Sequence, residues 1–129
     1  MKIYCYTGWL LIAIGCIHNA FGLIVGWPIL LDMVNDGVWN TVQPSGAVLF
    51  DRSAIVWFLL TGCFWWLLGG LMQHLLYQEL ALPRWLGFGF VLLGLLAGIV
   101  LPASGAWLFI PLGLLLCLPP RDSTYHHAV

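Results

Sequence analysis

Residues 4–26 read YCYTGWLLIAIGCIHNAFGLIVG, an apolar run that contains no Asp, Glu, Lys or Arg. Seven residues make nearly two helical turns, so glycines at this spacing fall on one side of a helix. The glycines that share this side are Gly8, Gly15, Gly22 and Gly26. His18 and Asn19 project from the same side, and small residues let a neighbouring helix approach closely. This face is therefore expected to point into a helical bundle.

The whole chain is too apolar for an ordinary soluble domain. Hydrophobic residues make up 62% and charged residues 7% of the chain, against roughly a quarter charged in such domains. The apolar segments are residues 4–26, 53–77, 85–101 and 103–118. The first two exceed the ~20 residues needed to cross a bilayer, and Pro102 with Gly105 breaks the last two into a hairpin. The sequence predicts an all-α, four-helix transmembrane bundle that forms one domain over residues 1–129.

The few charged residues predict an orientation. A net charge of −1 gives no reason to expect nucleic acid as a partner. With four spans, Lys2, Arg84 and Arg121 share one side of the membrane, and Arg52 lies alone on the other. Because positive charge accumulates on the cytoplasmic side, both termini and the tail 119–129 are predicted to be cytoplasmic.

Residues 27–51 form the one long segment expected outside the membrane. Pro28 is typical of a first helical turn, and Gly37 of the position just past a helix end. Between them an apolar face gathers Ile29, Leu30, Met33 and Val34. The pattern predicts a short helix in the outer interface, and we expect the segment to cover the outer mouth of the bundle as a lid.

The glycine pattern recurs in the other segments. In the second segment one face carries Gly62, Gly69 and Gln73. The first two helices are therefore expected to pack as an antiparallel pair, and the short loop 77–83 to make the second and third helices neighbours. The third segment places Gly94 and Gly98 at a close-packing spacing, and Pro111 is expected to kink the fourth.

The cysteines and histidines do not form a metal-binding pattern. All four cysteines stand alone in apolar surroundings with no Cys-x-x-Cys pair, which indicates plain packing. His18 and His74 lie at depths of roughly 12 and 30 Å, so they cannot be the two axial ligands of one haem. The adjacent His126 and His127 stand in a polar tail without pre-formed geometry. We therefore expect neither a metal nor a cofactor.

Three short pieces of sequence carry a resemblance: Gly8-Trp9-Leu10-Leu11 leading to His18 and Phe21-Gly22, then Arg84-Trp85-Leu86-Gly87, then Pro102-Ala103-Ser104-Gly105-Ala106-Trp107-Leu108. With these residues the chain resembles a family of small four-helix bacterial membrane proteins of unknown function, over most of residues 8–115. In layout it is also similar to the broad DoxX-like group. The resemblance implies a bacterial inner membrane location and brings no known catalytic residue.

A site is predicted from the unequal lengths of the helices. The last two segments are shorter than the ~30 Å hydrocarbon core, so the turn 102–105 should lie below the outer surface. The pocket above this turn is predicted to be bounded by His18, Asn19, Arg52, Trp57, Ser104 and Trp107. Two interpretations of His18 stay open: its ring bonds to a carbonyl or hydroxyl of a neighbouring helix, or it anchors this pocket.

Two classes of function follow. In the first, the protein binds a lipid-like or small apolar molecule, or acts as an accessory subunit of a homo-oligomer or larger membrane complex. In the second, it is an intramembrane enzyme that uses His18 as acid or base, with Asp51 or Arg52 assisting. Catalysis normally needs several titratable groups that converge, and only one lies securely inside the membrane segments. The binding class is therefore favoured.

Overall fold

The computed structural model describes residues 2–118, and these residues form helices and no strands. The α-helices are α1 (Thr7–Asn35), α2 (Phe50–Tyr77), α3 (Arg84–Val100) and α4 (Phe109–Cys117). Two short 3-10 helices, η1 (Lys2–Tyr6) and η2 (Gly105–Leu108), precede α1 and α4. The expectation of an all-α protein with four helices is confirmed.

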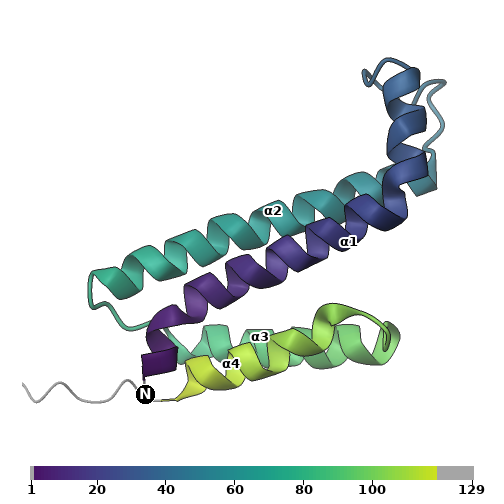
Figure 1. The fold of residues 1–129 in the computed structure, drawn as a ribbon. Coiled ribbons are helices and arrows are strands. Elements are labelled where there is room, and N and C mark those ends of the chain that lie inside the picture. The colour runs from purple at the N-terminus through teal and green to yellow at the C-terminus, as the bar shows by residue number, and fades with distance from the viewer. Residues whose placement is uncertain (1, 119–129) are drawn as a thin grey trace, which may run out of the picture.

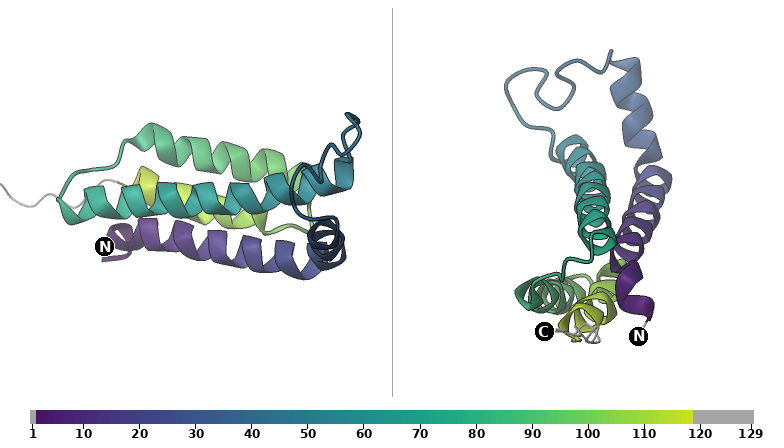
Figure 2. Two further views of the ribbon diagram at one scale, coloured as in Figure 1. Left: turned by 90° about the horizontal axis from the view of Figure 1, so that it is seen from above. Right: turned by 90° about the vertical axis from the view of Figure 1, so that its left-hand side faces the viewer.

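The helices form two antiparallel pairs, stacked as two layers (Figures 1 and 2). One layer is α1 with α2, and the other is α3 with α4, which is visibly shorter. The start of α1 and the end of α4 lie at one end of the molecule, and the loop 36–49 lies at the other, which we call the loop end. The α-carbons of α2 and α3 nowhere come within 8 Å of each other, so the expectation that these helices are neighbours is wrong. The glycine face of α2 packs on α1, and that of α3 packs on α4.

Glycines set the distance between α1 and α2. All four glycines of the predicted face, Gly8, Gly15, Gly22 and Gly26, are buried. A β-carbon added to Gly8 would lie 2.5 Å from the carbonyl oxygen of Gly69, so the two backbones touch there. At the loop end, a β-carbon on Gly26 would collide with the side chain of Ile55. The predicted antiparallel pair is confirmed, with the predicted faces in contact.

The second pair is built in the same way. A β-carbon on Gly113 would lie 2.5 Å from the carbonyl oxygen of Gly87, and one on Gly94 would lie 2.9 Å from the side chain of Ile110. The prediction for Pro111 is wrong, because α4 begins at Phe109 and has only nine residues. Pro111 therefore lies in the first helical turn, where its missing N–H group has no helical partner to lose.

The first helix continues where the sequence predicted a break. α1 has 29 residues and runs through Pro28 to Asn35 instead of ending near residue 26. Proline inside a helix removes a hydrogen bond and bends the axis, and Figure 1 shows α1 turning away from α3 and α4 in this part. The predicted end at Gly37 is confirmed. Its φ is +92°, and the amide of Val38 donates to the carbonyl oxygen of Met33 at 2.9 Å, as in a Schellman cap.

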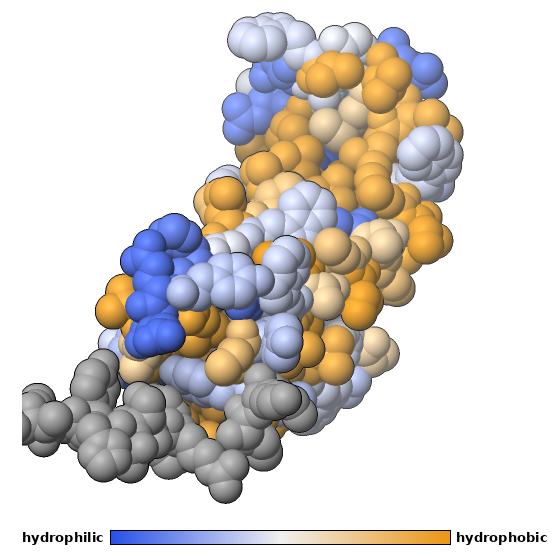
Figure 3. Space-filling view, turned by 60° about the vertical axis from the view of Figure 1, so that its left-hand side comes forward, coloured by the Kyte–Doolittle hydropathy of each residue, from blue (hydrophilic) through white to orange (hydrophobic). Residues whose placement is uncertain are grey.

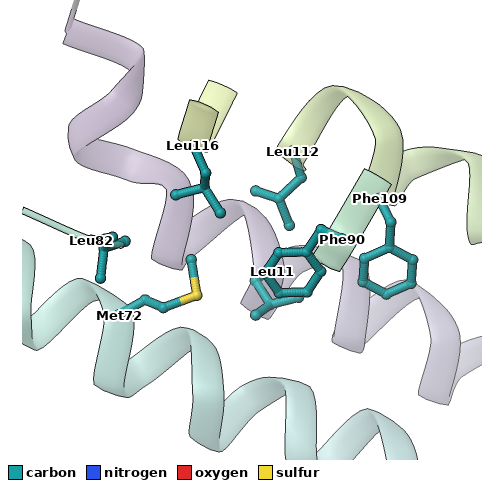
Figure 4. Packing of buried hydrophobic residues seen from close by; sticks show 7 residues of the cluster. All are labelled: Leu11, Met72, Leu82, Phe90, Phe109, Leu112 and Leu116. Carbon is teal, nitrogen blue, oxygen red and sulfur yellow. The ribbon is translucent and has the colours of Figure 1, made fainter. Parts of the chain in front are cut away.

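A small apolar core joins the two layers (Figure 4). Its members are Leu11, Met72, Leu82, Phe90, Phe109, Leu112 and Leu116. Phe90 and Phe109 stack with their ring centroids 5.6 Å apart. Although α2 and α3 lie apart, side chains from α1 and α2 meet those from α3 and α4 in this core and join the two layers.

Large apolar side chains remain exposed on the helices. Ile24 of α1 is 76% exposed, Leu67 of α2 71% and Ile99 of α3 72%. Figure 3 shows orange side chains spread over the middle of one face, while most of the strong blue lies near its ends. By length and composition, residues Tyr4–Asn35 and Phe50–Tyr77 could each cross a membrane, whereas Arg84–Val100 and Gly105–Cys117 are apolar but shorter.

The side chain of Gln73 makes two hydrogen bonds to the backbone at the start of α1. Its side-chain amide is buried, donates to the carbonyl oxygen of Cys5 at 2.8 Å and accepts from the amide of Trp9 at 3.2 Å. Trp9 stands in the first turn of α1, where backbone amides have no helical partner. The residue before the helix supplies no side-chain cap, so the neighbouring helix does so instead.

Replacing Gln73 with methionine should lower the free energy of unfolding by about 1–3 kcal/mol, because two backbone groups lose their partner. The measurement is unfolding in mixed detergent micelles, followed by circular dichroism. Gln78→Met is the matched control: Gln78 also stands at the end of α2, is exposed and bonds only to His74 of its own helix. Equal losses of free energy of unfolding in both variants would mean that the hydrogen bonds from Gln73 to the start of α1 do not stabilise the protein.

Candidate functional site

A cavity of about 300 Å³ lies where the shorter α3–α4 hairpin meets α1 and α2. The turn between α3 and α4 forms one wall, and the facing sides of α1 and α2 form the others. The residues that line it are Ile14, Ile17, His18, Phe21, Phe58, Trp65, Ala97, Leu101, Ala103, Ser104, Gly105, Ala106, Leu108 and Phe109. His18 and Ser104 are the polar side chains on this wall, apart from the indole N–H of Trp65. We call this space the hairpin cavity.

His18 is held in place on the wall by α2. Its Nε2 atom lies 2.9 Å from the carbonyl oxygen of Phe58, and its ring stacks on the Phe58 ring at 3.7 Å between centroids. The ring of Trp65 lies 4.4 Å away on a tilted plane. Since a carbonyl oxygen only accepts, Nε2 carries the hydrogen, and in the neutral imidazole Nδ1 therefore keeps its lone pair. The first interpretation of His18 is confirmed, because the ring bonds to a carbonyl oxygen of a neighbouring helix. The ring also lines the cavity, and its role as the anchor of a binding pocket stays a prediction.

Ser104 reaches the hairpin cavity from the turn that closes it. Its hydroxyl oxygen accepts a hydrogen bond from the amide of Ala106 at 3.3 Å and so caps η2. The amide of Ser104 itself donates to the carbonyl oxygen of Leu101 at 2.9 Å. The turn therefore holds its own backbone in shape and presents Ser104 on the wall that faces α1.

Asn19 is buried but lies outside the hairpin cavity. Its side chain fills the space at Gly62, between α1 and α2, and is only 7% exposed. The amide nitrogen lies 3.7 Å from the sulfur of Cys63, and the amide oxygen is enclosed without a hydrogen-bond partner. Although Asn19 is next to His18 in sequence, it serves the contact between the two helices.

Arg52 also lies outside the hairpin cavity, because its side chain bonds to the loop 36–49. Its guanidinium donates to a carboxylate oxygen of Asp36 at 2.7 Å and to the carbonyl oxygen of Thr41 at 3.0 Å. These contacts fix residues 36–49 to the start of α2. None of residues 27–51 lines the hairpin cavity, so the expectation that this segment covers the pocket as a lid is wrong. The bend of α1 after Pro28 carries the segment away from α3 and α4 (Figure 1).

The two tryptophans of the predicted site are placed elsewhere. Trp57 is 62% exposed on the outside of α2. Trp107 packs its ring against Gly98, and its indole nitrogen donates to the carbonyl oxygen of Pro102 at 2.9 Å. Trp107 therefore stabilises the turn through its hydrogen bond to Pro102 and does not line the hairpin cavity.

A second hollow of about 280 Å³ lies on the other side of Phe21 and Phe58, nearer the loop end. Its lining consists of Phe21, Gly22, Val25, Gly26, Ile29, Asp51, Ala54, Ile55 and Phe58. Phe21 and Phe58 line both spaces, so an apolar surface continues from the hairpin cavity toward Asp51.

The sequence prediction missed the aromatic walls. Phe58 and Trp65 are seven residues apart on α2, next to the predicted face of Gly62 and Gly69. This seven-residue spacing is the same as that of the glycines, so the sequence does indicate that both rings share a side of α2. Phe109 gave no comparable signal, because its position depends on where α4 begins.

The site contains few groups with acid–base chemistry. Among residues 2–118, no Asp, Glu, Lys or Arg lines the hairpin cavity, so none of these residues gives His18 a charged partner there. Within residues 2–118, His, Cys, Asp and Glu side chains form no group of three that could hold a metal ion. His126 and His127, which the sequence analysis considered, lie outside the described residues. The four cysteines, Cys5, Cys16, Cys63 and Cys117, are free thiols.

Comparison with known proteins places the chain in a family but gives it no activity. Neither the curated proteins nor the solved structures contain a significant match. The profile of a family of unknown function (DUF6463) matches residues 2–122. This confirms the resemblance at the level of an uncharacterised family, and the structure shows a small all-helical protein with four helices. The chain therefore belongs to the DUF6463 family.

Proposed function

We propose that the protein is a four-helix integral membrane protein that holds a lipid-like or small apolar molecule in the hairpin cavity. The bacterial inner membrane, with both termini in the cytoplasm, is the location that its sequence and charge distribution favour. In this orientation the loop end faces outward, and the hairpin cavity lies in the outer half of the bilayer.

Two observations support the membrane location. Exposed apolar side chains on α1, α2 and α3, such as Ile24, Leu67 and Ile99, would be a liability in water and suit a lipid environment. In addition, the turn between α3 and α4 satisfies its own backbone through Ser104 and Trp107. Lipid offers backbone groups no hydrogen bonds, so a turn below the membrane surface needs such internal partners.

The single observation that carries the binding function is the composition of the cavity wall. The lining is apolar and aromatic except for His18, Ser104 and the indole N–H of Trp65. Sites for small apolar molecules have this character: a large apolar wall with a few placed polar groups. A volume of about 300 Å³ is at the lower end of such sites, and the neighbouring apolar surface across Phe21 and Phe58 extends it.

The geometry gives the enzyme alternative no further support. Arg52 is engaged with Asp36, and Asp51 lines the second hollow, so neither assists His18 in the hairpin cavity. General acid–base catalysis usually relies on converging titratable groups. A lone histidine between aromatic rings is better suited to binding. Lipids or other membrane proteins, including a second copy of the chain, would cover the exposed apolar faces.

Partly filling the hairpin cavity should weaken binding about tenfold without unfolding the protein. Ala97 lines the cavity from α3, and a phenylalanine there would occupy part of its volume. The protein is purified in mild detergent, extracted with organic solvent and analysed by mass spectrometry for co-purified molecules. We expect Ala97→Phe to retain about tenfold less of the bound molecule than the wild type, a loss of affinity of about 1.4 kcal/mol.

Leu96→Phe is the matched control for this experiment. Leu96 is adjacent on α3, is exposed and does not line the cavity, so its replacement should leave the co-purified molecule at the wild-type level. If Ala97→Phe and Leu96→Phe retain the same molecules in the same amounts, the hairpin cavity is not the binding site.

A further inference from the structure

We propose that the hairpin cavity selects apolar molecules that carry a free hydroxyl group, such as long-chain or isoprenoid alcohols. The inference rests on the proposed function and deepens it, because it names the class of ligand. Its basis is two of the polar groups on the cavity wall, His18 and Ser104, of which the first accepts a hydrogen bond and the second donates one.

The acceptor is Nδ1 of His18. The contact between Nε2 and the carbonyl oxygen of Phe58 fixes the hydrogen on Nε2, so Nδ1 has a lone pair and no hydrogen. Nδ1 has no hydrogen-bond partner among residues 4–118. In the same residues, the one side-chain nitrogen or oxygen that is both enclosed and without a partner is Oδ1 of Asn19, so Nδ1 of His18 is not enclosed. Nδ1 is therefore accessible, on a ring that lines the cavity.

The donor is the hydroxyl of Ser104. Its oxygen accepts from the amide of Ala106, which leaves the hydroxyl hydrogen without a partner among the described residues. The hydroxyl hydrogen can rotate toward a ligand while the oxygen keeps its capping bond. Ser104 and His18 reach the same cavity from the turn and from α1, respectively.

Of the common polar groups on apolar molecules, a hydroxyl fits this pair best. A hydroxyl can donate to Nδ1 of His18 and can accept from Ser104, so it can give either wall group a partner. An ester, ketone or ether oxygen only accepts, which leaves His18 unpartnered in an apolar site. A plain hydrocarbon satisfies neither group. The ring faces of Phe58 and Trp65 and the surrounding aliphatic side chains accommodate the apolar body.

The test is competitive photolabelling of the purified full-length protein in lipid nanodiscs. The probe is an alkane that carries a diazirine, and the labelled positions are mapped by peptide mass spectrometry. Decan-1-ol, decyl methyl ether and decane compete for labelling of the cavity segment 97–109, each at the same concentration in the bilayer. We expect decan-1-ol to compete about fivefold more strongly than decyl methyl ether, the value of roughly one hydrogen bond, and at least fivefold more strongly than decane.

Two variants connect this preference to the wall groups. His18→Phe keeps an aromatic ring but removes the acceptor, and Ser104→Ala removes the donor. We expect labelling of segment 97–109 to persist in both variants, and the preference for the alcohol to fall to about twofold or less. The comparison of the three competitors on the wild type stands by itself if one variant fails to fold.

Two other outcomes overturn the inference in different ways. If the three competitors act equally on the wild type while segment 97–109 is labelled, the hydroxyl preference is wrong and the proposed binding function stands. If segment 97–109 is labelled no more strongly than the exposed faces of the helices, the proposed function fails, and the hydroxyl preference fails with it.

Discussion

Replacing Gly69 with leucine should lower the free energy of unfolding by about 3 kcal/mol, whereas the same change at Gly70 should cost nothing. A β-carbon on Gly69 would lie 2.7 Å from the carbonyl oxygen of Gly8 and 3.1 Å from the amide nitrogen of Ile12. Both are backbone atoms, which cannot move aside without separating α1 from α2. At Gly70 a β-carbon would meet no atom within 4 Å.

The two variants differ only in which side of α2 they change, so helix propensity cancels in the comparison. Leucine is a better helix former than glycine, and Gly70→Leu should therefore leave stability unchanged or raise it by up to about 1 kcal/mol. Unfolding in mixed micelles, followed by circular dichroism, measures both. Equal stability of Gly69→Leu and Gly70→Leu would show that α1 and α2 do not pack as described.

Replacing Phe109 with alanine should lower the free energy of unfolding by about 2–4 kcal/mol and loosen the contact between the two layers. Phe109 is buried, stacks on Phe90 and meets the ring of Trp65 edge-on at 4.7 Å between centroids. It thus links α3 and α4 to α2. In the membrane location proposed above, lipid would reduce the solvent part of this cost, but the loss of packing contacts would remain.

Phe88→Ala is the control for this second prediction. Phe88 stands on α3 and is 65% exposed, so its removal should change stability by less than about 0.5 kcal/mol. Unfolding of both variants under the same conditions gives the comparison. A loss for Phe109→Ala no larger than that for Phe88→Ala would contradict the bridging role of Phe109.

The parts of the fold that the sequence predicted correctly depend on local spacing. Glycines seven residues apart, such as Gly8 and Gly15, must share a side of any helix, and the partner at close distance follows from their lack of a side chain. Pro102 and Gly105 likewise force a turn wherever they lie. The shorter hairpin then leaves a space beside His18, and this reasoning brought His18 and Ser104 to one cavity.

The errors arise where one local signal permits two structures. Pro28 can begin a helix or bend one, and in the structure α1 continues through it to Asn35. Once α1 continues and bends, the loop moves away from the cavity, and Arg52 pairs with Asp36 instead of reaching His18. Trp57 and Trp107 were predicted to bound the pocket from their expected depth in the membrane alone, and this depth does not say which side of a helix a residue occupies.

The measurement that tests the binding function most directly is the distribution of adducts from the diazirine alkane on the wild-type protein in nanodiscs, without any competitor. A binding cavity predicts adducts concentrated on segments that line it, residues 14–21, 58–65 and 97–109, and saturation as the probe concentration rises. Labelling spread evenly over exposed side chains such as Ile24, Leu67 and Leu92, rising in proportion to the probe, would contradict a binding site in the hairpin cavity.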